Sequence, residues 1–146
     1  MNVLFVCTGN TCRSPMAEAY LKYKCPDLSV RSRGLSADFS PISENSAEAM
    51  KDFGIDISGF VSEPITSGDM VWADKIICMS ESHIAVLRLY TGMEKLSVLG
   101  DGIADHYGCD LTMYKKCRDQ ITKAIDNLER AVFSANCMLF RWKESI

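Results

Sequence analysis

Histidine and long apolar runs are scarce in this sequence. Only two of its 146 residues are histidine, His83 and His106. A zinc site needs about four ligands, so two histidines and the C-x4-C pair of Cys7 and Cys12 form a poor donor set. No window approaches the roughly 18 consecutive apolar residues of a membrane-spanning helix. We therefore expect no metal, no cofactor and no membrane partner.

An excess of positive charge is also missing. The formal net charge is −3 at pH 7, so the chain has no long-range attraction for nucleic acid. Met1 leads directly into a short apolar strand pattern, and we expect no secretory signal. The seven cysteines are odd in number and irregular in spacing, unlike those of a disulfide scaffold. These features predict a cytoplasmic protein with reduced thiols and no nucleic-acid partner.

Short apolar runs alternate with helical patterns along the chain. Strand patterns cover residues 2–6, 28–33, 75–79 and 96–99, and helical patterns cover residues 14–24, 43–54, 82–90 and 111–128. This alternation is typical of α/β proteins with a parallel sheet. We predict a single α/β domain over residues 1–146, with a central four-stranded parallel sheet flanked by helices. The tail, residues 132–146, is apolar for a C-terminus, and packing on the domain and contact with a partner are both open.

Residues 7–13 join the first predicted strand to the first predicted helix with the sequence C-T-G-N-T-C-R. Ser14 and Pro15 follow and suit a helix start. Ligands of α/β folds bind at this edge, outside the carboxyl ends of the strands, and unpaired N–H groups at a helix start attract anions. Gly9 permits a turn that residues with a Cβ resist. We predict that residues 7–13, named here the phosphate loop, surround a phosphate group.

Cys7 and Arg13 stand at the two ends of the phosphate loop. A loop curled around phosphate places the Cys7 thiol at its centre, and the Arg13 guanidinium can bind two phosphate oxygens. These surroundings predict a thiolate with a pKa of roughly 3.5–7.5 instead of about 8.5, assisted by a hydrogen bond from Ser14. A C-x5-R spacing alone arises by chance in many chains, but here a strand, a glycine and a helix start accompany it. The expected chemistry is nucleophilic attack by sulfur on phosphorus.

The segment C-T-G-N-T-C-R-S-P-M-A-E at residues 7–18 closely resembles the signature of the low-molecular-weight protein-tyrosine-phosphatase family. The similarity extends over nearly the whole chain. Residues 32–34 resemble the family's S-A-G segment with Arg33 in place of Ala, residues 54–56 its G-I-D, and residues 74–83 its strand followed by M-x-x-x-H. The resemblance implies a protein phosphatase with a cysteinyl-phosphate intermediate, no metal, and an Asn10 that holds the loop's shape.

A phosphatase also needs an acid that protonates the leaving atom and later activates water. Two candidates, Asp101 and Asp105, lie in the Gly-rich loop at residues 100–110, although aspartate also favours turns for purely local reasons. The family places its acid in a D-P-[YF] segment, which D-H-Y at residues 105–107 resembles. Asp105 is therefore the preferred candidate. His106 replaces the family's Pro, so a looser loop is expected.

Other side chains are expected around the substrate. Tyr107 is predicted to form one wall of the cleft. Phe39 is interpreted either as a second wall or as an ordinary core or surface residue. The predicted catalytic residues are Cys7, Arg13 and Asp105, and the predicted substrate-binding residues are Thr8, Gly9, Asn10, Thr11, Cys12, Ser14 and Tyr107.

Cys12 lies in the same loop as Cys7, and the resemblance implies that such a pair can form a reversible disulfide that shields the nucleophile from over-oxidation. An equal alternative is that Cys12 is only a small loop residue. An arsenate reductase of related fold is less favoured, because Cys109 and Cys117 fall too late in the chain for its two further cysteines. A non-enzymatic phosphate-binding module would have no use for Cys7, Arg13 and Asp105 together.

Thr11 separates two substrate classes. Tyrosine phosphatases of the family usually carry Ile there, and the T-G-N-T form of the loop resembles the bacterial protein arginine phosphatase branch. A smaller wall with a hydroxyl suits a planar, hydrogen-bonding guanidinium better than a branched alkyl group does. We therefore predict phosphorylated proteins as partners, phosphoarginine as the preferred residue with phosphotyrosine as the alternative, and inorganic phosphate as the product.

Overall fold

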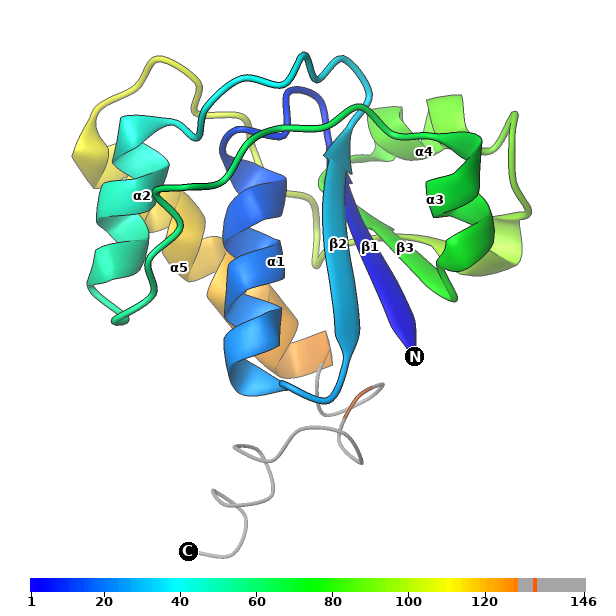
Figure 1. Ribbon diagram of the computed structural model, residues 1–146, viewed down its shortest axis with the longest axis horizontal. Helices are drawn as coiled ribbons and strands as arrows, with labels where there is room; N and C mark the ends of the chain where they lie inside the picture. Colours follow the sequence, from blue (N-terminus) through cyan, green and yellow to red (C-terminus); the bar gives the residue numbers. More distant parts are fainter. Residues whose placement is uncertain (129–132, 134–146) are drawn as a thin grey trace, which may run out of the picture.

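The computed structural model describes residues 1–128 and 133 (Figure 1). Apart from Phe133, the apolar tail discussed above lies outside the described residues. The elements in chain order are β1 (Asn2–Cys7), α1 (Arg13–Lys24), β2 (Ser29–Gly34), α2 (Glu44–Lys51), α3 (Ser67–Trp72), β3 (Lys75–Cys78), α4 (Glu81–Leu87), the 3-10 turn η1 (Met93–Lys95), β4 (Leu96–Val98) and α5 (Leu111–Leu128). None of the helices found in this part of the chain is long and apolar enough to cross a membrane.

The four strands form one sheet in the order β2-β1-β3-β4, and every neighbouring pair is parallel. Cys7, the last residue of β1, lies opposite Gly34 of β2, and Val6 lies opposite Cys78 of β3. The carboxyl ends of these strands therefore meet at one edge of the sheet, where the phosphate loop begins. The predicted four-stranded parallel sheet is confirmed.

Helices cover both faces of the sheet, with α1, α2 and α5 on one side and α3 and α4 on the other (Figure 1). Alternate residues of β1 serve the two faces. Val3, Phe5 and Cys7 pack with the first group of helices, while Leu4 and Val6 pack with the second. A strand buried on both faces must be apolar throughout, which explains the continuous run at residues 2–6.

The predicted helix starts lie within one residue of the observed ones, and the larger differences are two helix ends and one missed helix. Helix α1 begins at Arg13, with Cys12 as its N-cap, and not with Ser14 as the cap. Ser43, the first residue of the helical pattern predicted over residues 43–54, is the N-cap of α2, and its hydroxyl accepts a hydrogen bond from the Ser46 N–H. Helix α3 was not predicted, because its six residues are too few to show a helical period. It is stabilised by a capping box of Thr66 and Asp69.

Candidate active site

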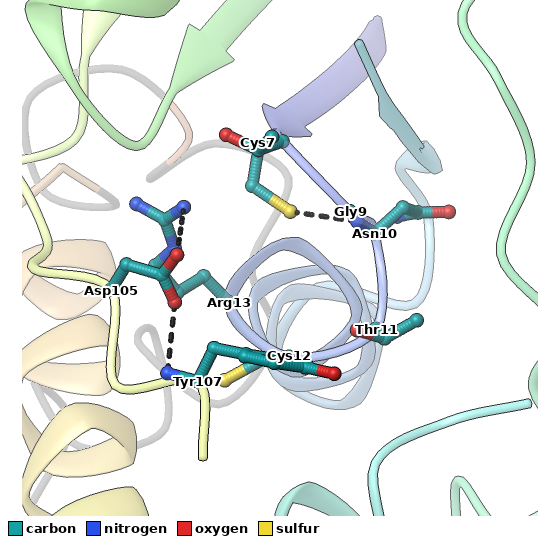
Figure 2. A pocket seen from close by; sticks show the side chains of 9 residues that line it. Cys7, Gly9, Asn10, Thr11, Cys12, Arg13, Asp105 and Tyr107 are labelled. Atoms are coloured by element: carbon teal, nitrogen blue, oxygen red, sulfur yellow. Dashed lines mark hydrogen bonds and ion pairs between the residues drawn. The ribbon is translucent and has the colours of Figure 1, made fainter. Parts of the chain in front are cut away.

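A cavity of about 200 Å³ opens at the carboxyl edge of the sheet (Figure 2). The phosphate loop forms one side of it, and the loop that precedes α5 forms the other. The three predicted catalytic residues all line this cavity. Its lining consists of Cys7, Thr8, Gly9, Asn10, Thr11, Cys12, Arg13, Asp105 and Tyr107. Ser14, also predicted for the site, is buried behind the lining.

The Cys7 sulfur is held by two groups of the loop. The Ser14 hydroxyl oxygen lies 2.8 Å from the sulfur, and the Asn10 backbone N–H donates to it over 3.2 Å. The same Ser14 oxygen accepts a hydrogen bond of 2.8 Å from the Asn10 side-chain amide. Because that oxygen already accepts from Asn10, its own hydrogen is available to a Cys7 thiolate.

The pKa of Cys7 is raised above its ordinary value, which differs from the lowered pKa predicted from the sequence. Burial is the largest cause, since only 2% of the residue is exposed. Hydrogen bonding to Ser14, the positive charge of Arg13 and the Asn10 N–H all act in the opposite direction. The sequence reasoning counted these donors and omitted the burial that a strand end imposes.

Asn10, and not Gly9, makes the tight turn of the phosphate loop. Asn10 has a φ of 56°, whereas a Cβ at Gly9 would only touch the Thr11 hydroxyl at 3.7 Å, and its φ is not left-handed. The sequence assignment of the turn to Gly9 was therefore wrong. The Asn10 amide donates to Ser14 and Ser32, and its oxygen accepts from the Glu63 N–H at 2.9 Å, which stabilises an otherwise uncommon conformation.

Gly34 allows the end of β2 to approach the phosphate loop closely. A Cβ at this position would lie 2.7 Å from the Thr8 carbonyl oxygen and 2.9 Å from the Asn10 Cβ. Real side chains do not tolerate such distances, so only glycine fits. Next to it, the Ser32 hydroxyl accepts from Asn10 and donates to Glu18 over 2.8 Å. Residues 32–34 at the end of β2 thus hold the phosphate loop through a close backbone approach and a hydrogen bond.

Arg13 and Asp105 meet across the cavity. One guanidinium nitrogen of Arg13 donates to the Ile103 carbonyl over 2.9 Å, and another lies 3.8 Å from an Asp105 carboxylate oxygen. The Asp105 side chain is 55% exposed, and its other oxygen accepts from the Tyr107 N–H (Figure 2). Asp101 instead lines a separate depression beside α5. Asp105, and not Asp101, therefore faces Arg13 across the cavity.

Two side chains considered for the cleft walls differ in position. Tyr107 lines the cavity and is 79% exposed. Phe39 is 65% exposed and has a left-handed φ of 51°, but it does not belong to the cavity lining. Within residues 1–128 and 133, no cluster of three or more His, Cys, Asp or Glu side chains is placed to hold a metal ion.

The sequence profile of the low molecular weight phosphotyrosine protein phosphatases matches residues 2–136. The chain belongs to this family. It is a protein phosphatase, as its relatives are.

Relatives of this phosphatase are named for two different substrates. A protein-arginine-phosphatase of Geobacillus stearothermophilus is 32% identical over 137 residues, which cover 86% of this chain and 92% of the relative. The low molecular weight protein-tyrosine-phosphatase PtpB of Staphylococcus haemolyticus is also 32% identical, over 88% and 97% of the two chains. A crystal structure of a low molecular weight protein tyrosine phosphatase from T. tengcongensis superimposes with a TM-score of 0.86 at 34% identity, over 90% and 99%.

His83 contacts the phosphate loop from α4, a role that the sequence analysis did not predict. This residue of α4 is 3% exposed. One ring nitrogen lies 2.9 Å from the Thr8 hydroxyl and the other 3.1 Å from the Ser80 hydroxyl. Burial, assisted by the charge of Arg13 and opposed by that of Asp105, lowers the pKa of His83 to about 4. The neutral His83 ring therefore bonds to Thr8, the first loop residue after Cys7. The only feature of the sequence that pointed to His83 was the M-x-x-x-H spacing of residues 79–83.

Proposed function

We propose that this phosphatase hydrolyses phosphoarginine in proteins through a phosphocysteine on Cys7. The Cys7 thiolate attacks phosphorus, while the Arg13 fork and the N–H groups of the phosphate loop bind the phosphoryl oxygens. Asp105 donates a proton to the departing guanidinium nitrogen, and the sulfur–phosphorus bond forms as the phosphorus–nitrogen bond breaks. The substrate protein leaves with an intact arginine.

The second half of the reaction returns Cys7 to its starting state. Asp105, now a carboxylate, accepts a proton from water, and the water oxygen attacks the phosphocysteine. The sulfur leaves as a thiolate, which the hydroxyl of Ser14 and the N–H of Asn10 stabilise at the distances described above. Inorganic phosphate is the product, and no step calls on a metal ion.

The observation that carries the choice of phosphoarginine is the position of Thr11. This half-buried residue lines the same cavity as Cys7 and Asp105, so its side chain meets the group attached to phosphorus. A threonine hydroxyl can bond a guanidinium N–H, whereas a phenol ring offers no such donor. Relatives named as protein-arginine-phosphatases, at 32% and 31% identity, are in line with this choice, and relatives named as tyrosine phosphatases match at the same level, so Thr11 carries the argument.

The test compares kcat/KM for a phosphoarginine peptide and a phosphotyrosine peptide in the wild type and in Thr11→Ile. We expect Thr11→Ile to shift the ratio toward phosphotyrosine, because about one methylene of steric filtering is worth about 1–3 kcal/mol, or about 10–200-fold. Thr112→Ile, at an exposed position of α5, is the matched control and should leave the ratio unchanged.

The competing function is hydrolysis of phosphotyrosine. The observation in its favour is Tyr107, an exposed aromatic wall against which a phenol ring can stack. The same experiment decides between the two. A wild type that prefers the phosphotyrosine peptide, with a ratio that Thr11→Ile does not alter, would establish the tyrosine phosphatase and remove the arginine proposal.

A further inference from the structure

Arg33 of β2 is the residue at which this chain departs from the family's S-A-G segment. Successive side chains of a strand point to opposite faces of the sheet. The Ser32 hydroxyl accordingly bonds to Glu18 of α1. The Arg33 side chain bonds to Asp69 of α3, on the other face. Because the Arg33 side chain is only 18% exposed, its guanidinium is held largely within the protein.

All three nitrogens of the Arg33 guanidinium have partners. The Nε atom donates to the Asp69 carboxylate over 3.1 Å, and one terminal nitrogen lies 3.3 Å from the Glu63 carboxylate. The other terminal nitrogen donates to the Ser32 carbonyl over 2.8 Å. Arg33 therefore ties β2 both to α3 and to residues 60–66, named here the chain before α3.

The chain before α3 crosses the carboxyl end of β2 (Figure 1) and holds Asn10. The Glu63 N–H donates to the Asn10 side-chain oxygen over 2.9 Å. The Glu63 carbonyl accepts from the Gly34 N–H, and the Gly34 carbonyl accepts from the Ile65 N–H, each over 3.0 Å. An N–H donor selects the oxygen of a side-chain amide, so the Asn10 nitrogen is turned toward Ser14.

We propose that Arg33 positions the Cys7 nucleophile through this series of contacts. Its two ion pairs hold the backbone of Glu63, and the Glu63 N–H holds the Asn10 amide. That amide orients the Ser14 hydroxyl toward the Cys7 sulfur, 2.8 Å away. Arg33 does not belong to the cavity lining, so it acts through these neighbours and not on the substrate. This role presupposes the nucleophilic role proposed above for Cys7.

Removal of this guanidinium should loosen the network without leaving a buried charge unpaired. Asp69 keeps Arg31, 3.3 Å from its carboxylate, and the N–H and hydroxyl of Thr66. The Glu63 side chain is 51% exposed, so water can replace its partner. The Glu63 N–H is then held by fewer contacts, and the Ser14 hydroxyl is directed less firmly at the sulfur.

Arg31 provides a matched control. It lies two residues earlier on the same face of β2, and it pairs with the same Asp69 carboxylate. Its guanidinium stacks on the Trp72 ring, 3.9 Å from the ring centre, and within the described part of the chain Glu63 is not among its ion-pair partners. Loss of Arg31 should therefore affect α3 and spare the N–H that holds Asn10.

The test measures how fast iodoacetamide alkylates Cys7 across a range of pH. Only the thiolate reacts, and fragmentation of the tryptic peptide of residues 1–13 distinguishes Cys7 from Cys12. In Arg33→Ala the profile should shift to higher pH, because the sulfur anion loses part of its hydrogen-bond support. The kcat for an activated aryl phosphate, which a phosphatase of either specificity can hydrolyse, should fall by about 2–30-fold, the range for residues that act through packed neighbours.

Further variants separate positioning from a loss of stability. Arg31→Ala should leave the alkylation profile and kcat unchanged, whatever its urea midpoint. Arg33→Lys can reach one carboxylate but lacks the planar fork, so it should lie between Arg33→Ala and the wild type. If Arg33→Ala does not fold, Arg33→Lys and Arg31→Lys make the same comparison. Every variant retains the other titratable groups around the sulfur, which are Cys12, Arg13, His83, Asp105 and Tyr107.

Two results would overturn the proposal. One is an Arg33 variant with the alkylation profile and kcat of the wild type. The other is an Arg31 variant with the same shift as its Arg33 counterpart, which would show a general effect of α3. A failure of the proposed function has a different signature, since turnover in Cys7→Ser would contradict the role of Cys7 and leave the alkylation profiles unaffected.

Discussion

Ser14 and Asn10 surround the Cys7 sulfur at hydrogen-bonding distance, and each already bonds to a second partner. Asn10 bonds to Ser32 and to the Glu63 N–H as well as to Ser14. Such a network orients the Ser14 hydroxyl toward sulfur before any substrate binds. Burial raises the pKa of Cys7 and these donors oppose that effect, so the residues that hold the loop also stabilise a negative charge on the Cys7 sulfur.

Cys7→Ser should abolish turnover without unfolding the protein. The hydroxyl is similar in size and can bond to Ser14, but it does not form a stabilised anion near neutral pH. The measurements are kcat with a phosphopeptide and the thermal midpoint Tm. Cys78→Ser, which also removes a buried thiol, should keep its activity. Equal kcat in the wild type and Cys7→Ser would exclude Cys7 as the nucleophile.

Asp105→Asn should lower kcat by about 10²–10⁴ on substrates with poor leaving groups. The amide oxygen of the substituted side chain still accepts from the Tyr107 N–H. The conformation of the loop before α5 should therefore be retained, while the proton that the carboxylic acid donates is lost. The decrease should be much smaller with an activated aryl phosphate, whose leaving group needs no proton. Asp101→Asn is the control, since Asp101 lines a different depression. The assignment fails if Asp101→Asn shows this dependence on the leaving group and Asp105→Asn does not.

At the scale of elements, two segments position the site from opposite sides. The loop before α5 is tied to the end of β3, where the Ile103 N–H donates to the Met79 carbonyl over 2.7 Å. It is also tied to α2, where the Asn45 amide donates to the Cys109 carbonyl over 3.1 Å. Asp105 lies between these anchors. On the other side, α4 holds the phosphate loop through His83 and Thr8.

The buried His83 of α4, which bonds to Thr8, predicts a pH dependence of stability. The pKa of His83 is about 4 in the folded protein, below its ordinary 6.5. Between these values the unfolded chain binds a proton that the folded protein does not, so the free energy of unfolding should decrease as the pH falls from about 6.5 to about 4. The stability that depends on a neutral His83 is fully present above pH 6.5.

Urea unfolding at several pH values tests this prediction with His83→Gln, whose side chain can still bond to Thr8. The variant should show a flatter pH dependence than the wild type across this range. His106→Gln removes the other histidine, from the loop before α5, and is the matched control. A wild type whose stability is constant between pH 6.5 and 4 would contradict a buried, neutral His83.

At the scale of the whole molecule, one sheet with helices on both faces places the reactive loop on a rigid base. Phe5 lies at the centre of this base and is fully buried in the cluster beneath α1 and α5. Phe5→Ala should therefore decrease the free energy of unfolding by about 3–5 kcal/mol. The control is Val71→Ala at an 81% exposed position of α3, with an effect within about 0.5 kcal/mol. Equal urea midpoints for the two variants would contradict this description of the core.

The sequence was sufficient for the parts of the fold and site that depend on neighbouring residues. The run at residues 2–6 is apolar because both faces of β1 are covered, and Cys7 and Arg13 are close enough in sequence to be recognised as one loop. The turn of the phosphate loop was wrongly assigned to Gly9, because glycine adopts a left-handed conformation more readily than other residues. Asn10 takes that conformation instead, since its amide gains partners from β2 and from the chain before α3.

The sequence by itself determined the four strands, the helices other than α3, the loop that carries Cys7 and Arg13, and the family. Only the tertiary structure decided that Asp105 rather than Asp101 faces Arg13 and that His83 bonds to Thr8. The physical reason is the range of the interactions involved. Backbone preferences and apolar periodicity act within a few residues. Contacts across about 75–92 positions form only when helices and loops pack on both sides of one sheet edge, and short-range sequence patterns do not encode them.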